Sequence, residues 1–387
     1  MQLHSVKKDE TLYAIARKHS IPATKILADN DLAGDRLTSG DELVIIKPTK
    51  TITVKGGDTL DSISKRFDVR KSSIIRDNPS LFGKEKLRPG QILTVKQDEV
   101  KIGAGSILGY AEKGLRREKF SKSLPYITYL TISMGIIKGD SVTESFLSND
   151  LRLNAVESGK IVLLGIRDES SGEFLSSKES YRKIIDATVR LAEERGFMGI
   201  SISAREASGL YPDAYCEFLF ELRKRLFGCN MILFTELFEN TLPEASEICD
   251  GAALNLELTP LDDAIKAMKS FSEKAESSKV FVKAVTRFTS RDLSLSVDDI
   301  KELCYRSGKE LITDEKSLIS RFDYVRYKIG KGEEIPIFFP SLRYIKAKLE
   351  ALCELGFMGI GCDIDTVPLS NLTMFNSMFA RADYSLA

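Results

Sequence analysis

The chain has 387 residues, enough for two or three domains. Its 56 basic and 56 acidic residues balance, so we expect neither nucleic acid nor an acidic membrane surface as a partner. No apolar run approaches the roughly 20 residues of a membrane span, and six irregularly spaced cysteines predict reduced thiols rather than a disulfide framework.

The first residues, MQLHSVKKDETLYAI, lack the apolar centre of a signal peptide, so we expect synthesis in the cytoplasm without one. Both histidines, His4 and His19, lie in this N-terminal part. A Ser-His-Asp triad, a Cys-His pair or a His-ligated zinc farther along the chain is therefore excluded.

The N-terminal part contains one pattern twice. Residues 11–30, TLYAIARKHSIPATKILADN, recur as residues 59–78, TLDSISKRFDVRKSSIIRDN, with Thr-Leu at the start and Asp-Asn at the end of each copy. Each copy then continues through a glycine into an apolar segment, at 37–46 and at 87–95. A repeat of this length is usually one supersecondary unit used twice. The helical spacing of the apolar residues predicts two helices between two strands in each unit.

Both copies resemble the LysM module over their whole length, and we place them at residues 1–48 and 49–97. The resemblance implies that each unit binds N-acetylglucosamine chains in a shallow groove between the loop before its first helix and the loop after its second. The alternative is that these loop residues only cap helices and form turns. The implied glycan-binding residues are Glu10, Thr11, Leu12, Asn30, Asp31, Asp58, Thr59, Leu60, Asn78 and Pro79.

Residues 98–387 alternate apolar segments with helical patterns. Several of these segments are continuously apolar, as expected for strands buried on both faces. The sequence GFMGI occurs at 196–200 and at 356–360, each time between a predicted helix and a predicted strand. These features favour an α/β fold of the (β/α)₈ TIM-barrel type. The eight predicted strands are 107–110, 127–133, 160–166, 199–203, 231–237, 251–258, 280–285 and 359–364.

Local signals add detail to this barrel. Ser176 with Glu179 predicts a capping box at the start of the helix that Gly196 ends. Residues 286–340 are longer than one strand-helix unit needs, so we expect a small α+β insertion there. Its last part predicts a hairpin around residues 330–332.

Three segments carry a resemblance to glycoside hydrolase family 18: ITYLTISMGIIKGD at 127–140, RGFMGISIS with PDAYCEFLFELRKRL at 195–226, and FFPSLRYIKAKLEALCELGFMGIGCD at 338–363. Together with the repeats, they resemble the spore-associated N-acetylglucosaminidases of peptidoglycan in that family. The resemblance implies an Asp-x-Glu at the end of the fourth strand. Its Glu would protonate the leaving oxygen, and its Asp would orient the acetamido group of the substrate.

The chain departs from this pattern at the catalytic positions. Ser203 occupies the Asp position and Arg205 the Glu position, and Leu256 occupies the position of a Tyr that the family carries after its sixth strand. An arginine stays protonated and cannot act as the acid near neutral pH. The family's last strand ends in a Trp, and this chain contains no Trp. Glu206 is the fallback candidate for the acid, although a shift of one residue along a strand points to the opposite face.

Carboxylates and an arginine follow several predicted strands, where the ligand face of a barrel lies. They could form a site for a polar or cationic ligand. The alternative is that Arg205 pairs with Glu257 or Glu236 and that ion pairs fill the old pocket. These barrel-mouth candidates are Asp168, Arg205, Glu236, Glu257 and Asp363.

The sequence leads to a hypothesis with two alternatives. The hypothesis is a protein of the cell wall or spore envelope that binds peptidoglycan or another N-acetylglucosamine polymer, together with spore-envelope proteins, and whose barrel has lost hydrolase activity. It needs neither cofactor nor metal. The first alternative is an active N-acetylglucosaminidase acting on spore cortex peptidoglycan or chitin-like glycans. The second is a barrel enzyme that uses the carboxylates with Mg²⁺.

Overall fold

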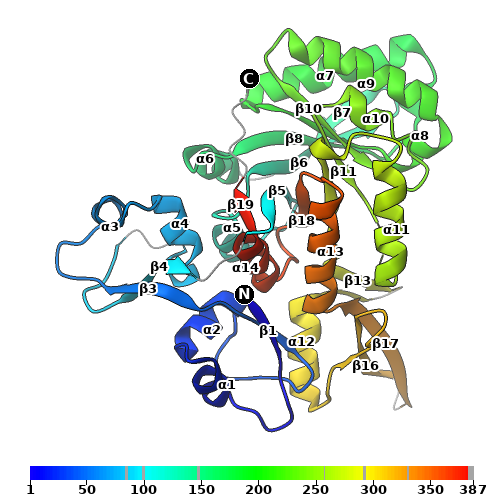
Figure 1. Ribbon diagram of the computed structural model, residues 1–387. Helices are drawn as coiled ribbons and strands as arrows, with labels where there is room; N and C mark the ends of the chain where they lie inside the picture. Colours follow the sequence, from blue (N-terminus) through cyan, green and yellow to red (C-terminus); the bar gives the residue numbers. More distant parts are fainter. Residues whose placement is uncertain are drawn as a thin grey trace.

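The computed structural model describes residues 1–82, 86–97, 101–145, 149–256, 258–290, 293–328 and 331–381. Two small N-terminal units lie beside a closed barrel, as Figure 1 shows with the units in blue to cyan and the barrel from cyan at β5 to red. The predicted fold class is thereby confirmed. Within the described residues, no helix is both long and apolar enough to span a membrane.

The first repeat has the predicted strand-helix-helix-strand order, and its two strands pair antiparallel. The Thr11 hydroxyl caps the first helix by accepting a hydrogen bond from the Ala14 amide at 3.2 Å. Leu12, Ile15 and Ile26 are buried between the helices and the sheet. The elements are β1 (Gln2–Ser5), α1 (Leu12–His19), α2 (Ala23–Asn30) and β2 (Glu42–Ile45).

The second repeat has the same order with one additional short helical turn. Thr59 and Ser62 form a reciprocal capping box at its first helix. Ile63, Ile74 and Leu93 form the centre of its core. The elements are β3 (Pro48–Thr53), α3 (Leu60–Phe67), α4 (Lys71–Arg76), the 3₁₀ turn η1 (Pro79–Leu81) and β4 (Ile92–Gln97).

Eight parallel strands form the barrel, and the pairing of β5 with β6 closes it. All eight predicted strands are present. The predicted strand 251–258 is shorter than expected, because the chain leaves the sheet after Leu254 to approach Pro260 at the start of the next helix. The strands are β5 (Gly103–Ala111), β6 (Tyr129–Lys138), β8 (Ile161–Asp168), β9 (Gly199–Ser203), β10 (Ile232–Leu237), β11 (Gly251–Leu254), β12 (Val280–Lys283) and β18 (Gly359–Asp363).

The helices pack around the outside of the strands, and β7 (Ser141–Glu144) and β19 (Phe379–Arg381) extend the sheet locally. Inside the barrel, large side chains such as Tyr129, Phe234 and Phe281 fill the space, so the barrel is a packed core and not a pore. The helices are α5 (Arg117–Ser123), α6 (Asn149–Glu157), α7 (Lys178–Arg195), α8 (Arg205–Leu210), α9 (Pro212–Phe227), α10 (Ala245–Ile248), α11 (Leu261–Ser272), α13 (Leu342–Glu354) and α14 (Leu369–Met378), with 3₁₀ turns η2 (Glu173–Leu175) and η3 (Ser277–Lys279).

Both copies of the GFMGI sequence connect a helix to a strand, as predicted. Gly196 ends α7 in the left-handed conformation at φ 66°. Gly359 begins β18 so close to β5 that a Cβ atom would lie 1.9 Å from the carbonyl oxygen of Ser106. The capping prediction was wrong by one residue: Ser177, not Ser176, caps α7, because the amide of Ser176 closes the preceding 3₁₀ turn by donating to the Glu173 carbonyl.

The insertion lies between β12 and β18 and contains the predicted hairpin, but residues 331 and 332, which were expected in its turn, already belong to the second strand. β16 and β17 pair antiparallel from Ile319 with Pro340 to Lys328 with Lys331, and their connection lies outside the described residues. The elements are β13 (Arg287–Ser290), β14 (Leu293–Ser296), α12 (Val297–Ser307), β15 (Ile312–Thr313), β16 (Ile319–Lys328) and β17 (Lys331–Pro340).

Both repeats dock onto the barrel. The first repeat contributes Val44 and Ile46 to the main hydrophobic cluster of the barrel. Its Glu42 accepts hydrogen bonds from Arg343, at 2.5 Å from Nε and 3.0 Å from the backbone amide. The second repeat donates from Arg76 Nε to Asn376 at 2.9 Å. The three parts therefore form one packed assembly.

Candidate functional site

The loop before α1 is held by a chain of polar contacts that is special to the first repeat. Glu10 accepts hydrogen bonds from the Lys7 amide at 3.0 Å and contacts His4 Nε2 at 2.8 Å, while His4 Nδ1 lies 3.1 Å from His19 Nε2. Burial opposes ionisation of Glu10, but the Lys7 hydrogen bond and His4 outweigh it and lower the pKa of Glu10. Leu12 is buried in the core, and Thr11 caps the helix.

Asn30 and Asn78, which end the two copies of the repeated pattern, bind the closing strand of their repeat through side-chain hydrogen bonds. Asn78 donates to the carbonyls of Ile74 and Thr94 and accepts from the Thr94 amide, all at 2.7 Å. Asn30 makes the equivalent contacts in the first repeat, which include donation to Val44 at 2.9 Å and acceptance from its amide at 2.7 Å. Because these amides bind the closing strand, they fix the shape of the loop after the second helix.

The remaining candidate residues of the repeats have different surroundings in the two copies. Asp31 forms an ion pair with Lys122 of the barrel at 2.6 Å. Asp58 accepts from the Lys55 amide at 2.8 Å and pairs with Arg66 at 3.3 Å, which leaves it within its own repeat. Leu60 is buried, Thr59 caps α3, and Pro79 starts η1.

Pro79 also lines a groove of about 580 Å³ between the two repeats. Lys25 and Ala28 of α2 form the opposite wall, and Lys25 donates to the Asp77 carbonyl at 3.2 Å across the groove. The loop after the second helix of the second repeat therefore faces the first repeat, and not solvent alone.

At the barrel mouth, the positions implied as catalytic carry no carboxylate. Ser203 is the last residue of β9, and Arg205 is the first residue of α8, with its guanidinium 4.5 Å from the ring centre of Phe238. Leu256 follows β11 and packs at the edge of the core. Together with Phe238, Arg205 and Leu256 line a largely apolar cavity of about 1020 Å³ beside α11.

Glu206, the fallback candidate, lies on α8 and is exposed, where it accepts a hydrogen bond from the Ser171 hydroxyl. Asp168 at the end of β8 shapes the following turn, because its carboxylate accepts from the Ser170 and Gly172 amides at 2.8 Å and 3.0 Å. Glu257 lies outside the described residues, so the predicted pairing of Arg205 with it stays a prediction.

Lys283, which the sequence did not single out, occupies the centre of the mouth. It projects from the end of β12, and its Nζ lies 3.4 Å from Glu236 and 3.7 Å from Asp363. Asn255 donates to the same Glu236 at 2.5 Å. Among the described residues, Glu236 thus forms its ion pair with Lys283 and not with Arg205. A lysine within an apolar strand was the one signal that could have indicated this arrangement.

Five residues form a mouth cluster: Tyr110, Glu236, Asn255, Lys283 and Asp363. The charges in this cluster stabilise the protonated form of Lys283. Burial disfavours the charge of Lys283, but Glu236 and Asp363 outweigh it and raise the pKa of this lysine. The ammonium lies 4.3 Å from the ring centre of Tyr110. Burial, followed by the two carboxylates, raises the pKa of Tyr110 well above its ordinary value.

The mouth cluster offers little room for a metal. The two carboxylates already share one ammonium, which offsets one of their two negative charges and repels a cation. No three His, Cys, Asp or Glu side chains gather as a metal site anywhere in the part of the chain that the structure describes. The arrangement can hold a polar ligand by hydrogen bonds, and the two carboxylates of the mouth cluster are both paired with Lys283.

Comparison with known proteins identifies the repeats. The LysM domain family matches residues 4–45 and 52–96. The chain carries two LysM domains. They are the two repeat units described above, and the matched ranges run from within β1 to the end of β2 and from within β3 into β4.

Solved structures show the same whole-chain arrangement. The spore cortex-lytic enzyme SleL of Bacillus megaterium QM B1551 has a TM-score of 0.76 at 20% identity, over 99% of both chains. SleL of Bacillus cereus has a TM-score of 0.74 at 18% identity, over 98% of this chain and 99% of that one. A chitinase from Chromobacterium violaceum covers 71% of this chain, and this chain covers 98% of it, at 11% identity and a TM-score of 0.63. At these identities the likeness establishes the fold.

One curated relative matches part of the chain. YdhD of Bacillus subtilis (strain 168), a protein named as a candidate sporulation-specific glycosylase, is 24% identical over 244 residues. The match covers 60% of this chain and spans 57% of the length of YdhD.

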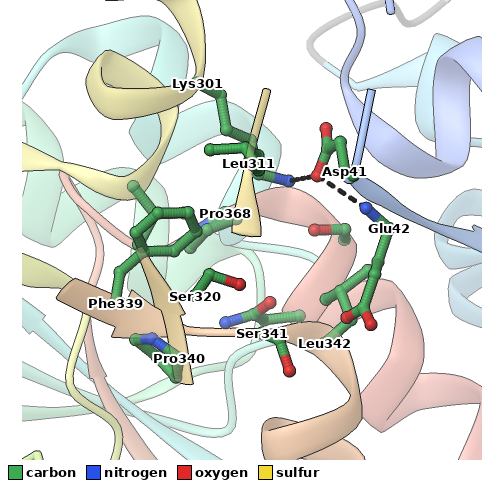
Figure 2. Close-up of a pocket in the computed structure, with 14 residues that line it drawn as sticks. Asp41, Glu42, Lys301, Leu311, Ser320, Phe339, Pro340, Ser341, Leu342 and Pro368 are labelled. Carbon is green, nitrogen blue, oxygen red and sulfur yellow. Dashed lines mark hydrogen bonds and ion pairs between the residues drawn. The ribbon is translucent and has the colours of Figure 1, made fainter. Parts of the chain in front are cut away.

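The first LysM domain makes further contacts with the barrel insertion. Asp41 pairs with Lys301 of α12 at 2.8 Å and accepts from the Glu42 amide at 2.7 Å, as Figure 2 shows. The Leu311 amide donates to the Ser39 carbonyl at 2.9 Å. The insertion therefore holds the loop that leads into β2, on the side away from the second LysM domain.

Proposed function

We propose that this protein binds a wall polymer of N-acetylglucosamine, such as peptidoglycan, through its LysM domains, and that its barrel no longer hydrolyses the polymer. We place the LysM domains at 1–48 and 49–97 and the barrel at 98–387. Localisation in the spore envelope or cell wall, beside other spore-envelope proteins, completes the proposal. It draws on the relatives named as spore cortex-lytic enzymes and as a sporulation-specific glycosylase.

One observation supports the proposed loss of hydrolysis. At the barrel mouth, where a hydrolase needs an acid, the carboxylates of the mouth cluster are held in ion pairs with Lys283. Arg205 occupies the acid position and stacks on Phe238, and an arginine cannot deliver a proton near neutral pH. Within the part of the chain that the structure describes, Lys283 binds both carboxylates of the mouth cluster, Glu236 and Asp363.

The second candidate is an active N-acetylglucosaminidase that acts on cortex peptidoglycan or chitin-like glycans. Glu206 favours it, because this exposed carboxylate lies next to Arg205 at the mouth side of the barrel. To act as the acid of a retaining glycosidase, Glu206 would need to reach the glycosidic oxygen. In the structure, its carboxylate instead accepts a hydrogen bond from Ser171 of the β8–η2 loop.

The test is a paired assay. The full-length protein is incubated with purified spore cortex peptidoglycan and sedimented, and the supernatant is analysed for muropeptides by mass spectrometry. We expect the protein in the pellet and no released muropeptides. Released products that end in N-acetylglucosamine, lost in a Glu206→Gln variant, would establish the second candidate. Protein that stays in the supernatant would disprove the binding function.

A further inference from the structure

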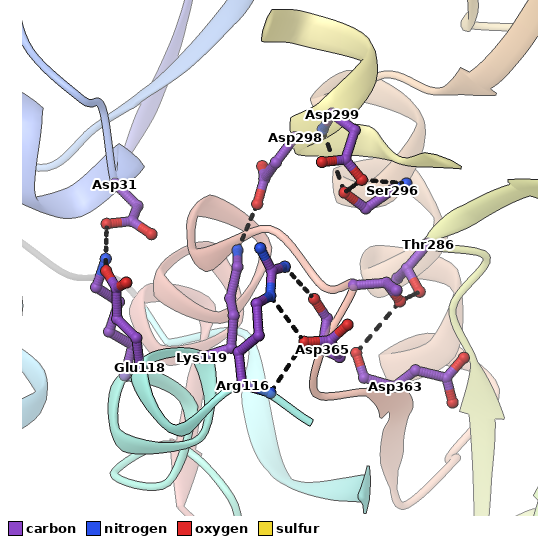
Figure 3. Close-up of polar contacts among 12 residues, drawn as sticks. Asp31, Arg116, Glu118, Lys119, Thr286, Ser296, Asp298, Asp299, Asp363 and Asp365 are labelled. Atoms are coloured by element: carbon purple, nitrogen blue, oxygen red, sulfur yellow. Dashed lines mark hydrogen bonds and ion pairs between the residues drawn. The ribbon is translucent and has the colours of Figure 1, made fainter. Parts of the chain in front are cut away.

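A second cavity lies where the first LysM domain meets the barrel. This seam cavity, of about 460 Å³, is lined by the loop that follows α2, by α5 with its preceding residue, and by α12 of the insertion. Its volume falls within the range of small-ligand sites. Figure 3 shows several of its side chains, with Asp31 on the LysM side and Lys119 and Asp298 on the barrel side.

Charged groups of both signs are fixed around the seam cavity by mutual pairing. Asp31 pairs with Lys122 at 2.6 Å, and Lys119 pairs with Asp298 at 2.5 Å. Burial disfavours the charge of Lys122, but its hydrogen bonds to Asp31 and Glu118 outweigh it and raise the pKa of this lysine. Each ammonium has three N–H donors and each carboxylate several acceptor positions, so the pairs retain hydrogen-bonding capacity toward the cavity.

Because the two signs alternate, the seam cavity has no strong preference for an anion or a cation. The fixed donors and acceptors suit a neutral ligand that presents many hydroxyl and amide groups. Such a ligand satisfies both kinds of partner at once and carries no charge that must be desolvated.

An aromatic ring completes the seam cavity. Tyr305 of α12 lines it and is 40% exposed, and the Arg36 guanidinium lies 5.4 Å from its ring centre. Tyrosine offers a flat apolar face with a polar edge. A pyranose ring also has an apolar C–H face with hydroxyls around its rim. An aromatic face beside paired donors and acceptors is therefore the chemistry that recognises a sugar.

The seam cavity is continuous with the first LysM domain. Asn30 and Asp31 belong to the loop that the LysM resemblance assigns to the glycan groove, and both line the cavity. We propose that the seam cavity is a glycan subsite, shared by the first LysM domain and the barrel, that holds N-acetylglucosamine units running on from the LysM groove. The proposal rests on the proposed glycan-binding function and gives the barrel a part in it.

The absence of tryptophan from the chain makes a direct test possible. A Tyr305→Trp variant places one indole in the seam cavity, where its emission reports a sugar that stacks on it. Phe227→Trp is the matched control, because Phe227 is an exposed barrel aromatic with Arg223 5.8 Å from its ring centre. Both full-length variants are titrated with the N-acetylglucosamine hexamer, and calorimetry of the wild-type protein gives the saturating concentration.

We expect a saturable emission change in Tyr305→Trp and none in Phe227→Trp. We also expect Tyr305→Ala to bind the hexamer about tenfold more weakly, equivalent to about 1.4 kcal/mol, while Phe227→Ala binds as the wild type does. Circular dichroism and melting curves establish that Tyr305→Ala is folded.

Hexamer binding with no emission change in Tyr305→Trp and no loss in Tyr305→Ala would overturn the subsite and leave the proposed function intact. No calorimetric binding of the hexamer or of cortex fragments by the wild type would overturn both.

Discussion

Lys283 lies between Glu236 and Asp363. Only 19% of the Lys283 side chain is exposed, and only 9% of the Glu236 side chain is exposed. A buried carboxylate that loses its counter-ion keeps its desolvation cost. The sequence placed both carboxylates at the barrel mouth, because strand ends can be read from apolar segments. It did not identify their partner, because three separate strands bring these side chains together.

Replacing Lys283 by methionine should therefore destabilise the protein by about 3 kcal/mol, as measured by urea unfolding at pH 7. Adding Glu236→Gln to this variant should recover part of the loss, because the uncompensated charge is removed. Lys71→Met is the control, since Lys71 pairs with the exposed Asp61 at 3.1 Å and the change should cost about 0.5 kcal/mol or less. A double variant less stable than Lys283→Met alone would contradict the pairing.

Asp29 is a buried carboxylate in the first LysM domain, 1% exposed and 2.6 Å from Lys25 Nζ. Burial outweighs the attraction of Lys25 and raises the pKa of Asp29 from 3.8 to about 6. A group whose pKa is raised by folding stabilises the fold while it is protonated. Its contribution is complete below about pH 4 and is lost as the pH rises through 6.

We expect Asp29 to lower the free energy of unfolding by about 2 kcal/mol between pH 4 and pH 7. An Asp29→Asn variant should lose this part of the pH dependence, and Asp61→Asn, at an exposed position of α3, should retain it. Urea unfolding at several pH values measures the slope. An unchanged slope in Asp29→Asn would rule out this carboxylate as the titrating group.

At the scale of elements, the repeated pattern predicted two equal LysM units, and the structure places them in unequal surroundings. Gly40 and Gly90 occupy equivalent positions before the closing strands, at φ 84° and 86°. A Cβ atom on Gly40 would lie 2.0 Å from the carbonyl oxygen of Leu311, whereas one on Gly90 would meet nothing within 4 Å. Both glycines have the left-handed backbone conformation, but only Gly40 lies against the insertion.

Gly90→Ala should thus cost about 1 kcal/mol, from the left-handed backbone alone. Gly40→Ala should cost about 3 kcal/mol or more, because Leu311 must also move. In Gly40→Ala the amide of Leu311, which donates to Ser39, should exchange its hydrogen faster. Equal costs for the two substitutions would mean that the insertion does not press on this loop.

At the scale of the whole molecule, the barrel and the first LysM domain share one core. Val44 and Ile46 of the LysM domain pack in the same cluster as Ile345 and Leu372 of the barrel helices. Glu42 is 4% exposed and depends on Arg343 for its charge pairing. Elements joined by a common core tend to unfold together.

Calorimetry should therefore show the first LysM domain and the barrel melting in one transition. Arg343→Met leaves Glu42 buried without its cation, and we expect an earlier, separate LysM transition in this variant. Lys346→Met is the control on the same helix α13, since its pair with Glu350 is exposed to solvent. Two transitions already present in the wild type would show that the domains are thermodynamically independent.

The sequence by itself determined the repeat, the eight strands and the insertion with its hairpin, and it led to the proposal that Arg205 replaces the catalytic acid. These depend on the periodicity of apolar residues and on residue identity, which are properties of the chain alone. Only the tertiary structure decided that Lys283 binds Glu236 and that Asp31 pairs with Lys122 across the seam cavity. Such pairings depend on distances between elements far apart in sequence, and the packing of the whole core sets those distances.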